Sequence, residues 1–478
     1  MIPLPASPGF PHCTQDDETM DFRTAVTAAI LSGWLIACQG PTPASYPQAA
    51  VSAPTQVQER EQEPPSPVES ASTWSSEEGL EVLLRRAEVA SPTVRAAFQR
   101  WKAARERIPQ VQALPNPWVS LGGYVQSVET RTGPMDGRLG INQNVPWPGK
   151  LETAGDQAAA IAEGARMQVE SARLAVRRRF LRDWTERVYL EQAETILGGQ
   201  VALLEHIENV SLTLYEAGSV SQADALRAQV ERLEMSDRLD TLLQLEAPLL
   251  AAMEASLGVP FEGETSWDTQ TLLDQAHLPP EEELRQSLLA NSPELLGLHA
   301  LVAAAGEAQR LADLEGMPDF SIGADWTWIG QGNPTQAGSG DDALALTLAV
   351  EIPLQRGAID GARSQALANR RQVLERRALR QWQLLADLQS ALAAHEDAHR
   401  RITLFKDHLI PKAEQTYGAT LAAYQAGQAA FQDMLDAARV VLEFRLSAAR
   451  AAADAALAYA DLNGLLPAPL LIAEGSVQ

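Results

Sequence analysis

The tract LYEAGSVSQADALRA, residues 214–228, has a second version, AYQAGQAAFQDMLDA, at residues 423–437. Both follow the order Y-x-x-G-x-x-x-x-x-D, and the two tyrosines are 424 − 215 = 209 residues apart. The glycines and aspartates keep that separation: Tyr215, Gly218 and Asp224 belong to the first tract, and Tyr424, Gly427 and Asp433 to the second. Repetition at a fixed distance indicates that one supersecondary unit occurs twice in the fold.

Proline-containing pairs extend the repeat on the N-terminal side of the tracts. Ser91-Pro92 recurs 201 residues later, whereas Val145-Pro146 recurs 207 residues later as Ile352-Pro353. The separation grows because the second copy holds extra residues between these pairs, and insertions collect in exposed turns. We therefore expect residues 330–342 (GQGNPTQAGSGDD) to form a longer turn than their counterpart at residues 129–136.

Composition bounds the class of protein. The chain has 478 residues and a formal net charge of −24, and aromatic residues make up 5% of it. An acidic chain is a poor partner for nucleic acid, because phosphate binding needs a basic surface. The apolar content leans on alanine and leucine, which favours long helices. No run of 18 apolar residues follows the N-terminal region, so we expect no membrane-spanning helix in the mature chain.

The N-terminal region resembles a secretory leader. Met20, the preferred start, opens MDFRTAVTAAILSGWLIAC, an apolar stretch that ends at Cys38. This order is typical of a signal peptide, and Leu-Ile-Ala-Cys resembles a lipoprotein signal with Cys38 as the lipidated first residue. Gln39 after it would imply outer-membrane sorting; the alternative is a chance cysteine. We assign residues 1–37 to the upstream segment and leader, and residues 38–76 to a disordered linker rich in Pro, Gln, Ser and Glu.

Four segments alternate apolar residues with small or polar ones, which is the period of a β-strand. At about ten residues each, they match the length of a membrane-spanning strand. Tryptophans near the strand ends suit an interfacial aromatic belt. The alternative is a soluble sheet with one solvated face. The expected strands are residues 118–128, 139–145, 320–328 and 343–352, and the tryptophans are Trp118, Trp147, Trp326 and Trp328.

Alanine-rich stretches without proline predict long helices. The stretch 150–216 would be about 100 Å long at 1.5 Å per residue. Each repeat is then a strand pair followed by a long helical hairpin, with Pro411 expected to kink one helix. The other expected helices are residues 77–101, 221–256, 361–426 and 431–463. The first repeat is placed at 77–258, a connector at 259–280, the second repeat at 281–467 and a tail at 468–478.

Four membrane strands cannot close a barrel, and an open sheet edge in lipid leaves backbone groups unsatisfied at several kcal/mol each. The smallest closed membrane barrels have about eight strands. If these strands lie in lipid, two chains would supply eight strands and three chains twelve. The small inward-facing residues leave room for water, which favours the larger barrel. With the long helices continuing as a wall, the fold class is an α+β membrane protein that forms a duct.

The chain resembles the TolC-type outer-membrane efflux protein family from Glu77 to about Pro467. The resemblance rests on the duplication, on strand pairs followed by long hairpins, and on the tract Y-x-x-G-x-x-x-x-x-D-x-L-x-A in both copies. It implies a homotrimer whose twelve-stranded barrel, four strands per chain, continues into a periplasmic α-helical barrel. It also implies an exit duct in the outer membrane that works with a periplasmic adaptor (membrane fusion) protein and an inner-membrane pump. Residues 115–117 and 145–150 resemble the heavy-metal efflux branch.

The resemblance implies a gate at the two tracts. Asp433 and Asp436 lie at i and i+3, on one helix face, and the family's matching carboxylates line the periplasmic constriction. Threefold symmetry would bring six carboxylates together, and repulsion among them would oppose closure. The first tract has Asp224 and, in place of the second acid, Arg227. An Asp436–Arg227 contact is our hypothesis for a latch of the closed state.

The remaining residues of the two tracts are assigned to the tips of the helical hairpins, where an adaptor would dock. Gly218 and Gly427 suit a helix-ending turn with left-handed backbone. Tyr215 and Tyr424 are expected to pack within the tips.

The segment HEDAH, residues 395–399, matches the zinc-protease pattern H-E-x-x-H. It lies within a long repeated helix, and a catalytic zinc site needs a third ligand and a cleft. A zinc metalloenzyme at His395, Glu396 and His399 is therefore a remote alternative, which peptide cleavage abolished by Glu396→Gln would establish. The other alternative is a lipid-anchored periplasmic coiled-coil scaffold without a pore. We predict no enzyme activity and no cofactor, and the cargo is not identified by the sequence.

Overall fold

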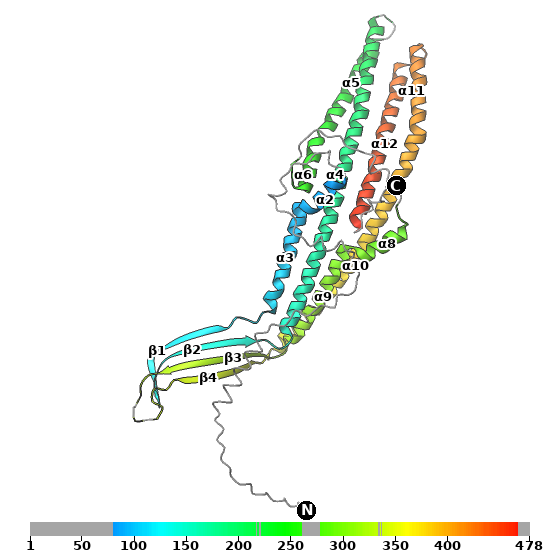
Figure 1. Ribbon diagram of the computed structural model, residues 1–478. Coiled ribbons are helices and arrows are strands. Elements are labelled where there is room, and N and C mark those ends of the chain that lie inside the picture. The colour runs from blue at the N-terminus through cyan, green and yellow to red at the C-terminus, as the bar shows by residue number, and fades with distance from the viewer. Residues whose placement is uncertain are drawn as a thin grey trace, which may run out of the picture. The chain divides into compact units, whose positions relative to one another are not determined.

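The computed structural model describes residues 80–216, 218, 221–260, 278–332, 335 and 337–466. All of them belong to one compact unit, Glu63–Gln478. Within it, two short helices, two strands and a long helical hairpin follow one another, and the same order then recurs (Figure 1). The first set is α2 (Leu80–Ala90), α3 (Pro92–Gln112), β1 (Trp118–Thr130), β2 (Gly133–Val145), α4 (Lys150–Glu216), α5 (Gln222–Leu243) and α6 (Glu246–Leu257). The second is α8 (Glu281–Asn291), α9 (Pro293–Leu314), β3 (Asp319–Ile329), β4 (Ala343–Glu351), α10 (Arg356–Thr403), η3 (Leu404–Leu409), α11 (Ile410–Gln425) and α12 (Phe431–Leu465).

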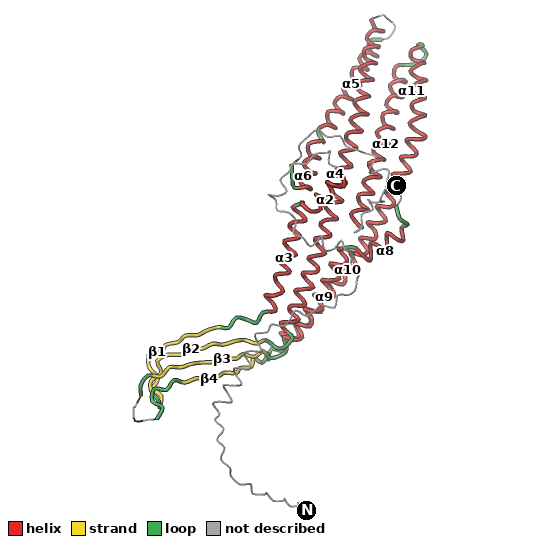
Figure 2. The backbone as a smooth tube through the Cα atoms, in the orientation of Figure 1, coloured by secondary structure: helices red, strands yellow, loops and turns green. Residues whose placement is uncertain are grey.

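The four strands form one antiparallel sheet in the order β1-β2-β3-β4, which lies at the opposite end of this unit from the hairpin tips (Figure 2). The register places apolar residues of all four strands on one face: Val119 pairs with Ile141, Ile141 with Ala324, and Ala324 with Leu346. On the other face, Ser120 pairs with Gly140 and Gly140 with Asp325. The predicted alternation therefore corresponds to a sheet with one apolar face and one face of small and polar residues. The outer strands, β1 and β4, each have an unpaired edge.

The sequence underestimated the first strand pair. The expected turn at residues 129–136 is wrong in extent, because β1 continues to Thr130 and β2 already begins at Gly133. Residues 133–138 (GPMDGR) contain two glycines and a proline and lack alternation, so nothing in their side chains indicates a strand. Here the pairing of Glu129 with Pro134 and of Thr130 with Gly133 extends the ladder. Trp118 also differs from expectation, since its partner Asn142 puts it on the polar face.

The long helices follow the prediction, with two interruptions. The helix expected over 221–256 is wrong as one piece, because α5 ends at Leu243 and α6 begins at Glu246. Pro248 lacks the N–H that would bond to the carbonyl of Gln244, so the regular ladder cannot run through this point. Before Pro411, residues 404–409 form a π-helical turn, in which the Ile410 N–H donates to the Phe405 carbonyl. Proline thus interrupts the regular helix at both places.

Among the described residues, one segment, Glu281–Leu314, has an 18-residue window apolar enough to cross a membrane, with a mean hydropathy of 1.3. It consists of two helices, because the backbone of Ser292 is extended between α8 and α9. A Cβ at Gly297 would lie 3.1 Å from the Cβ of Met167, so α9 approaches α4 closely at this glycine. We attribute the apolar character of the segment to packing against α4 and α10 rather than to a membrane span.

Three clusters of buried residues hold the helices together. One joins α2, α3, α4, α6 and α12 around Phe180 and Met253. A second joins the tips of both hairpins through α4, α5 and α12 around Leu204 and Met434. A third joins α8, α9, α10 and the end of α12 around Leu288 and Leu462. The two helical hairpins are thus packed side by side along their length, which fixes the tips relative to each other.

Candidate functional site

The first tip turn is built by Gly218 and Ser221. Gly218 has a φ of 72°, and its N–H donates to the carbonyl of Tyr215 at 2.9 Å. Ser221 caps α5: its Oγ accepts from the Asp224 N–H at 3.3 Å and donates to the Asp224 carboxylate at 2.8 Å. The carboxylate of Asp224 therefore lies in the first turn of α5, where a negative charge is stabilised by the helix dipole.

The second tip repeats this geometry. Gly427 has a φ of 71°, and its N–H donates to Tyr424 at 2.9 Å. The Ala430 N–H donates to the Asp433 carboxylate at 3.3 Å, in the first turn of α12. Both glycines adopt the predicted left-handed turn, and both aspartates of the repeated tract satisfy helix N-termini. The turn and the helix cap that follows it therefore explain the spacing between glycine and aspartate in each tract, without any role in a pore.

The two tyrosines of the tips differ. Tyr424 stacks edge-on against Phe431 with ring centroids 5.7 Å apart, and its hydroxyl is buried. Burial raises the pKa of Tyr424, and the nearby charge of Asp224 in the first tip adds to the rise. Tyr424 therefore packs against the buried cluster that joins the two tips. Tyr215 is 43% exposed, so it is available for contact with another molecule.

Arg227 and Asp436 have separate partners within the chain. Arg227 lies 3.6 Å from the Asp224 carboxylate. Asp436 accepts from Gln432 at 3.1 Å and from Arg439 at 3.2 Å. The predicted Asp436–Arg227 contact is therefore not formed inside one protomer.

Arg439 is the residue that sequence reasoning missed. Besides bonding Asp436, its guanidinium donates to the carboxylate of Glu231 on α5, at 3.1 Å from Nε. Glu231 is only 7% exposed, so this ion pair joins the two hairpins at the edge of the tip cluster. The sequence held one clue. Glu231 continues the buried face of α5 formed by Ala225 and Ala228, and a carboxylate on such a face needs a cation.

His395 and His399 do contact each other, with their Nε2 atoms 3.2 Å apart. Burial lowers the pKa of His395, the neighbouring His399 lowers it further, and Glu396 opposes the shift. Within the described ranges, no group of three or more His, Cys, Asp or Glu side chains could hold a metal ion. The third ligand that a catalytic zinc site needs is therefore not supplied by the described part of the chain.

The strand–helix junction is held by residues of both halves. Lys150, 8% exposed, donates from Nζ to both carboxylate oxygens of Asp319 at 2.8 and 2.9 Å. Asp319 also accepts from the Trp147 N–H at 2.7 Å, and the Trp147 ring stacks on Phe320. The motif at residues 145–150 thus fastens the start of β3 to the start of α4.

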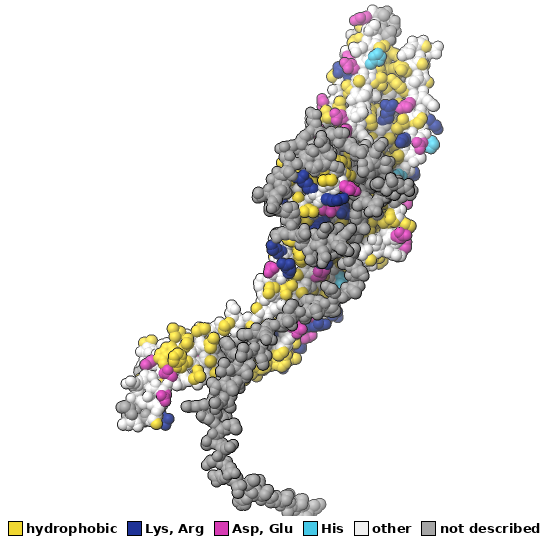
Figure 3. Space-filling view, viewed as in Figure 1, with side chains coloured by type: hydrophobic (Ala, Val, Ile, Leu, Met, Phe, Trp, Pro, Cys, Tyr) yellow, Lys and Arg dark blue, Asp and Glu magenta, His cyan; other side chains and the backbone are white. Residues whose placement is uncertain are grey.

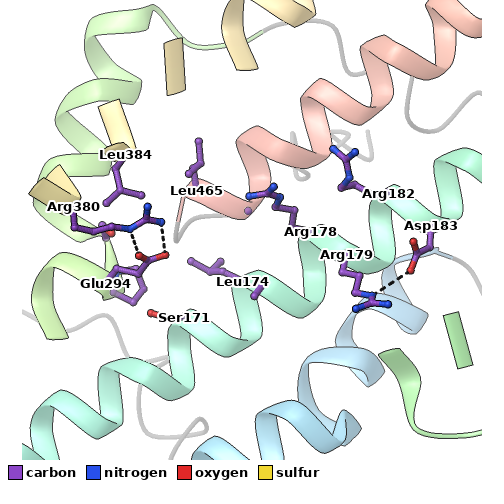
Figure 4. Close-up of a pocket in the computed structure, with 14 residues that line it drawn as sticks. Ser171, Leu174, Arg178, Arg179, Arg182, Asp183, Glu294, Arg380, Leu384 and Leu465 are labelled. Carbon is purple, nitrogen blue, oxygen red and sulfur yellow. Dashed lines mark hydrogen bonds and ion pairs between the residues drawn. The ribbon is translucent and has the colours of Figure 1, made fainter. Parts of the chain in front are cut away.

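A cavity of 310 Å³ lies between α4, the α8–α9 junction, α10 and the end of α12 (Figure 4). Its lining includes four arginines, each of which lies within 4 Å of a carboxylate. Arg380 pairs with Glu294, and Arg179 lies 3.8 Å from Asp183; Arg178 and Arg182 share Asp461. Because its cations are already neutralised, the cavity does not have the character of an anion site.

The chain is similar in sequence and in fold to known proteins. Residues 284–467 match the family model described as outer membrane efflux protein. The cobalt-zinc-cadmium resistance protein CzcC of Cupriavidus metallidurans is 23% identical over 388 residues, which cover 77% of this chain and 84% of that protein. The structure of VceC from Vibrio cholerae superposes with a TM-score of 0.66 at 18% identity, over 82% of this chain and 96% of that one. For CusC the values are 0.67 and 15%, over 80% and 91%.

The fold defined by the strand pairs and long hairpins is that of the TolC-like outer-membrane channels. Residues 284–467, most of the second set of elements, match the outer membrane efflux protein family, whose members are efflux channels and not enzymes. Its place is accordingly the outer membrane. The metalloenzyme and the scaffold without a pore are set aside. Cys38, the leader and the linker lie outside the described residues, so their assignments stay predictions.

Proposed function

We propose that three copies of this chain form a twelve-stranded barrel and a helical duct, the exit channel of a tripartite efflux system. The observation that carries the proposal is the four-stranded sheet with two open edges and an exposed apolar face. Leu344, Leu346 and Leu348 of β4 are 61–73% exposed in the single chain. Hydrophobic side chains gather over the strands in Figure 3. Such a face suits lipid, and lipid does not tolerate open edges.

Closure between chains would continue the pairing already present. With four strands in alternating directions, β4 of one protomer and β1 of the next are antiparallel, like every pair within the sheet. The opposite face would line the lumen, with Arg138 and Asp325 paired at 3.0 Å. Along α10, Leu379 and Trp382 are 58% and 70% exposed, and a neighbouring protomer would cover them. We also assign the recurring element order to an internal duplication.

Partners and cargo follow from the same proposal. The tips would meet a periplasmic adaptor protein, with exposed Tyr215 among the contacts, and an inner-membrane pump would supply the energy. The likeness to CzcC supports divalent metal cations as the cargo. Cys38 would carry the lipid anchor. Asp433 and Asp436 of three chains would form the constriction, and the Asp436–Arg227 latch would join neighbouring protomers, since it is not formed within one.

Cysteine cross-linking tests the closure. Val119→Cys on β1 is combined with single cysteines at Leu344, Leu346 or Leu348 on β4, and each single variant serves as its control. The proposal expects at least one pair to give covalent trimers on non-reducing gels, together with ion conductance of the purified protein in planar bilayers. Cross-linking that stops at dimers would indicate an eight-stranded barrel instead. Failure of every pair to exceed its single variants, with no conductance, would refute the channel.

Metal sensitivity tests the cargo. Deleting the gene should sensitise its host to cobalt, zinc or cadmium, and the intact chain should restore resistance. Unchanged sensitivity to all three ions would argue against metal cargo while leaving the channel intact.

A further inference from the structure

Two imidazoles of α10 meet at one point on the helix surface. His395 and His399 are four residues apart, so they lie one above the other on one face. Their ring centroids are 4.4 Å apart and their Nε2 atoms 3.2 Å apart, and both side chains are half-buried. Two bare ring nitrogens at this distance repel each other. The contact therefore requires a shared proton or a cation between them.

The separation fits a chelate. Zinc–imidazole bonds are about 2.0–2.1 Å long, so two nitrogens bound to one ion lie about 3.3 Å apart at a tetrahedral angle. At a right angle, as in octahedral or square-planar coordination, they lie about 2.9 Å apart. The observed 3.2 Å lies between these two values. The pair could accept an ion without changing rotamer, because the bite distance is already set by the helix.

The charges around the pair do not oppose a cation. Asp397 engages Arg400 at 2.6 Å and Arg401 at 2.9 Å, and Arg401 also pairs with Asp454 at 2.9 Å. These guanidinium groups are thus held on carboxylates. Glu396, next to His395, is exposed and adds a negative charge.

We propose that His395 and His399 form a two-histidine site for a borderline divalent metal ion, of the class Zn²⁺, Co²⁺, Ni²⁺ or Cu²⁺. Both imidazoles bind through Nε2 with their proton on Nδ1; the ring of the neutral pair that carried its proton on Nε2 exchanges it through solvent for one on Nδ1, so no net proton is released. Water completes the coordination, so the site is open and non-catalytic. The inference uses two residues of one chain and stands independently of the barrel and of the cargo.

Metal binding to the full chain in detergent, prepared without a polyhistidine tag, tests the site. Zn²⁺ affinity is measured by calorimetry, and Cu²⁺ is examined by electron paramagnetic resonance for coupling to imidazole nitrogens. His395→Gln and His399→Gln should each weaken the strongest Zn²⁺ site at least tenfold and reduce the coupled nitrogens from two to one. His408→Gln, a solitary exposed histidine near the same helix, is the matched control and should change neither. Circular dichroism verifies that all variants keep their helix content.

Two results would overturn the proposal. One is Zn²⁺ affinity and nitrogen coupling in His399→Gln equal to those of the wild type. The other is a loss in His408→Gln as large as that in the two chelate variants, which would mean that the measured binding is diffuse. Channel conductance is not needed for either reading, so failure of this site is distinguishable from failure of the duct.

Discussion

Removing the charge of Arg439 while keeping its aliphatic stem isolates the ion pair that joins the two hairpins. In Arg439→Met, the carboxylate of Glu231 loses its guanidinium partner but remains 7% exposed between α5 and α12. Methionine retains most of the packing that the stem provides. The variant therefore tests the consequence of an uncompensated buried charge at the tips.

The expected magnitude follows from the burial of the two partners. Leaving one charge of a fully buried pair unpaired costs about 3–5 kcal/mol. Here the Arg439 side chain is 42% exposed, so water can reach the vacated position and the cost falls to about 2 kcal/mol. Replacing both partners by apolar residues, as in Glu231→Leu with Arg439→Met, removes the buried charge altogether. The double variant should remain within about 1 kcal/mol of the wild type.

Hydrogen exchange read by mass spectrometry measures local opening of the tips directly. A loss of about 2 kcal/mol corresponds to about 30-fold faster exchange across the first turns of α12 and the facing part of α5. Arg445→Met is the matched control, because Arg445 and its partner Glu414 are both about half exposed. An exposed pair contributes at most about 0.5 kcal/mol, so exchange there should rise about twofold.

Two outcomes would refute this reasoning. Equal acceleration in Arg439→Met and Arg445→Met would show that burial of Glu231 does not matter. A double variant as unstable as Arg439→Met alone would show that the single variant failed through lost packing rather than through an unpaired charge.

Three further predictions concern other parts of the chain. Burial raises the pKa of Asp183 above 3.8, although the charges of neighbouring arginines oppose the shift. The protonated carboxyl therefore contributes to the stability of the folded state below pH 3.8, and this contribution is lost as the pH rises through the folded-state pKa. Asp183→Asn should therefore stabilise the protein at pH 7 and lose this advantage near pH 3.5, as measured by thermal unfolding at both pH values; an advantage independent of pH would contradict the assignment. Gly427→Ala should destabilise the tip by about 1 kcal/mol because of its positive φ. Gly418→Ala is the control, because Gly418 lies at a regular and open position of α11; it should stabilise its helix by up to about 1 kcal/mol. Hydrogen exchange that changes in the same direction in Gly427→Ala and Gly418→Ala would show that the positive φ of Gly427 does not matter. Lys150→Met should lower the free energy of unfolding by about 1–3 kcal/mol, because Asp319 loses two charged hydrogen bonds. An unchanged midpoint of thermal unfolding in calorimetry would show that stacking of Trp147 on Phe320 is enough to hold the junction.

Sequence patterning predicted the regular elements well and their interruptions poorly. The helix over 150–216 and the four strands follow directly from period and from the absence of proline. Strand residues 133–138 were missed because their pairing comes from the neighbouring backbone rather than from their own side chains. The break at 244–245 was missed because a proline three residues later removes a bond upstream of itself.

At the tips, the repeated tract identified the turn but not its energetics. Gly427 and Asp433 are local features, and their roles in the turn can be inferred from spacing alone. Arg439 and Glu231 are 208 residues apart, and their pairing depends on how two hairpins pack, which one sequence does not reveal. The same holds for Lys150 and Asp319.

The π-helical turn at residues 404–409 lies in the hairpin that has the longer connection to its tip. Tyr215 follows Pro146 by 69 residues, whereas Tyr424 follows Pro353 by 71. Extra residues in a regular helix would lengthen it by about 1.5 Å each and rotate its whole distal face by about 100° each. A π-helical turn takes up one added residue locally, so the helix beyond it is displaced and rotated less than an uninterrupted helix would be. A small insertion in this helix can therefore be accommodated with less disturbance of the packing between α11 and α12.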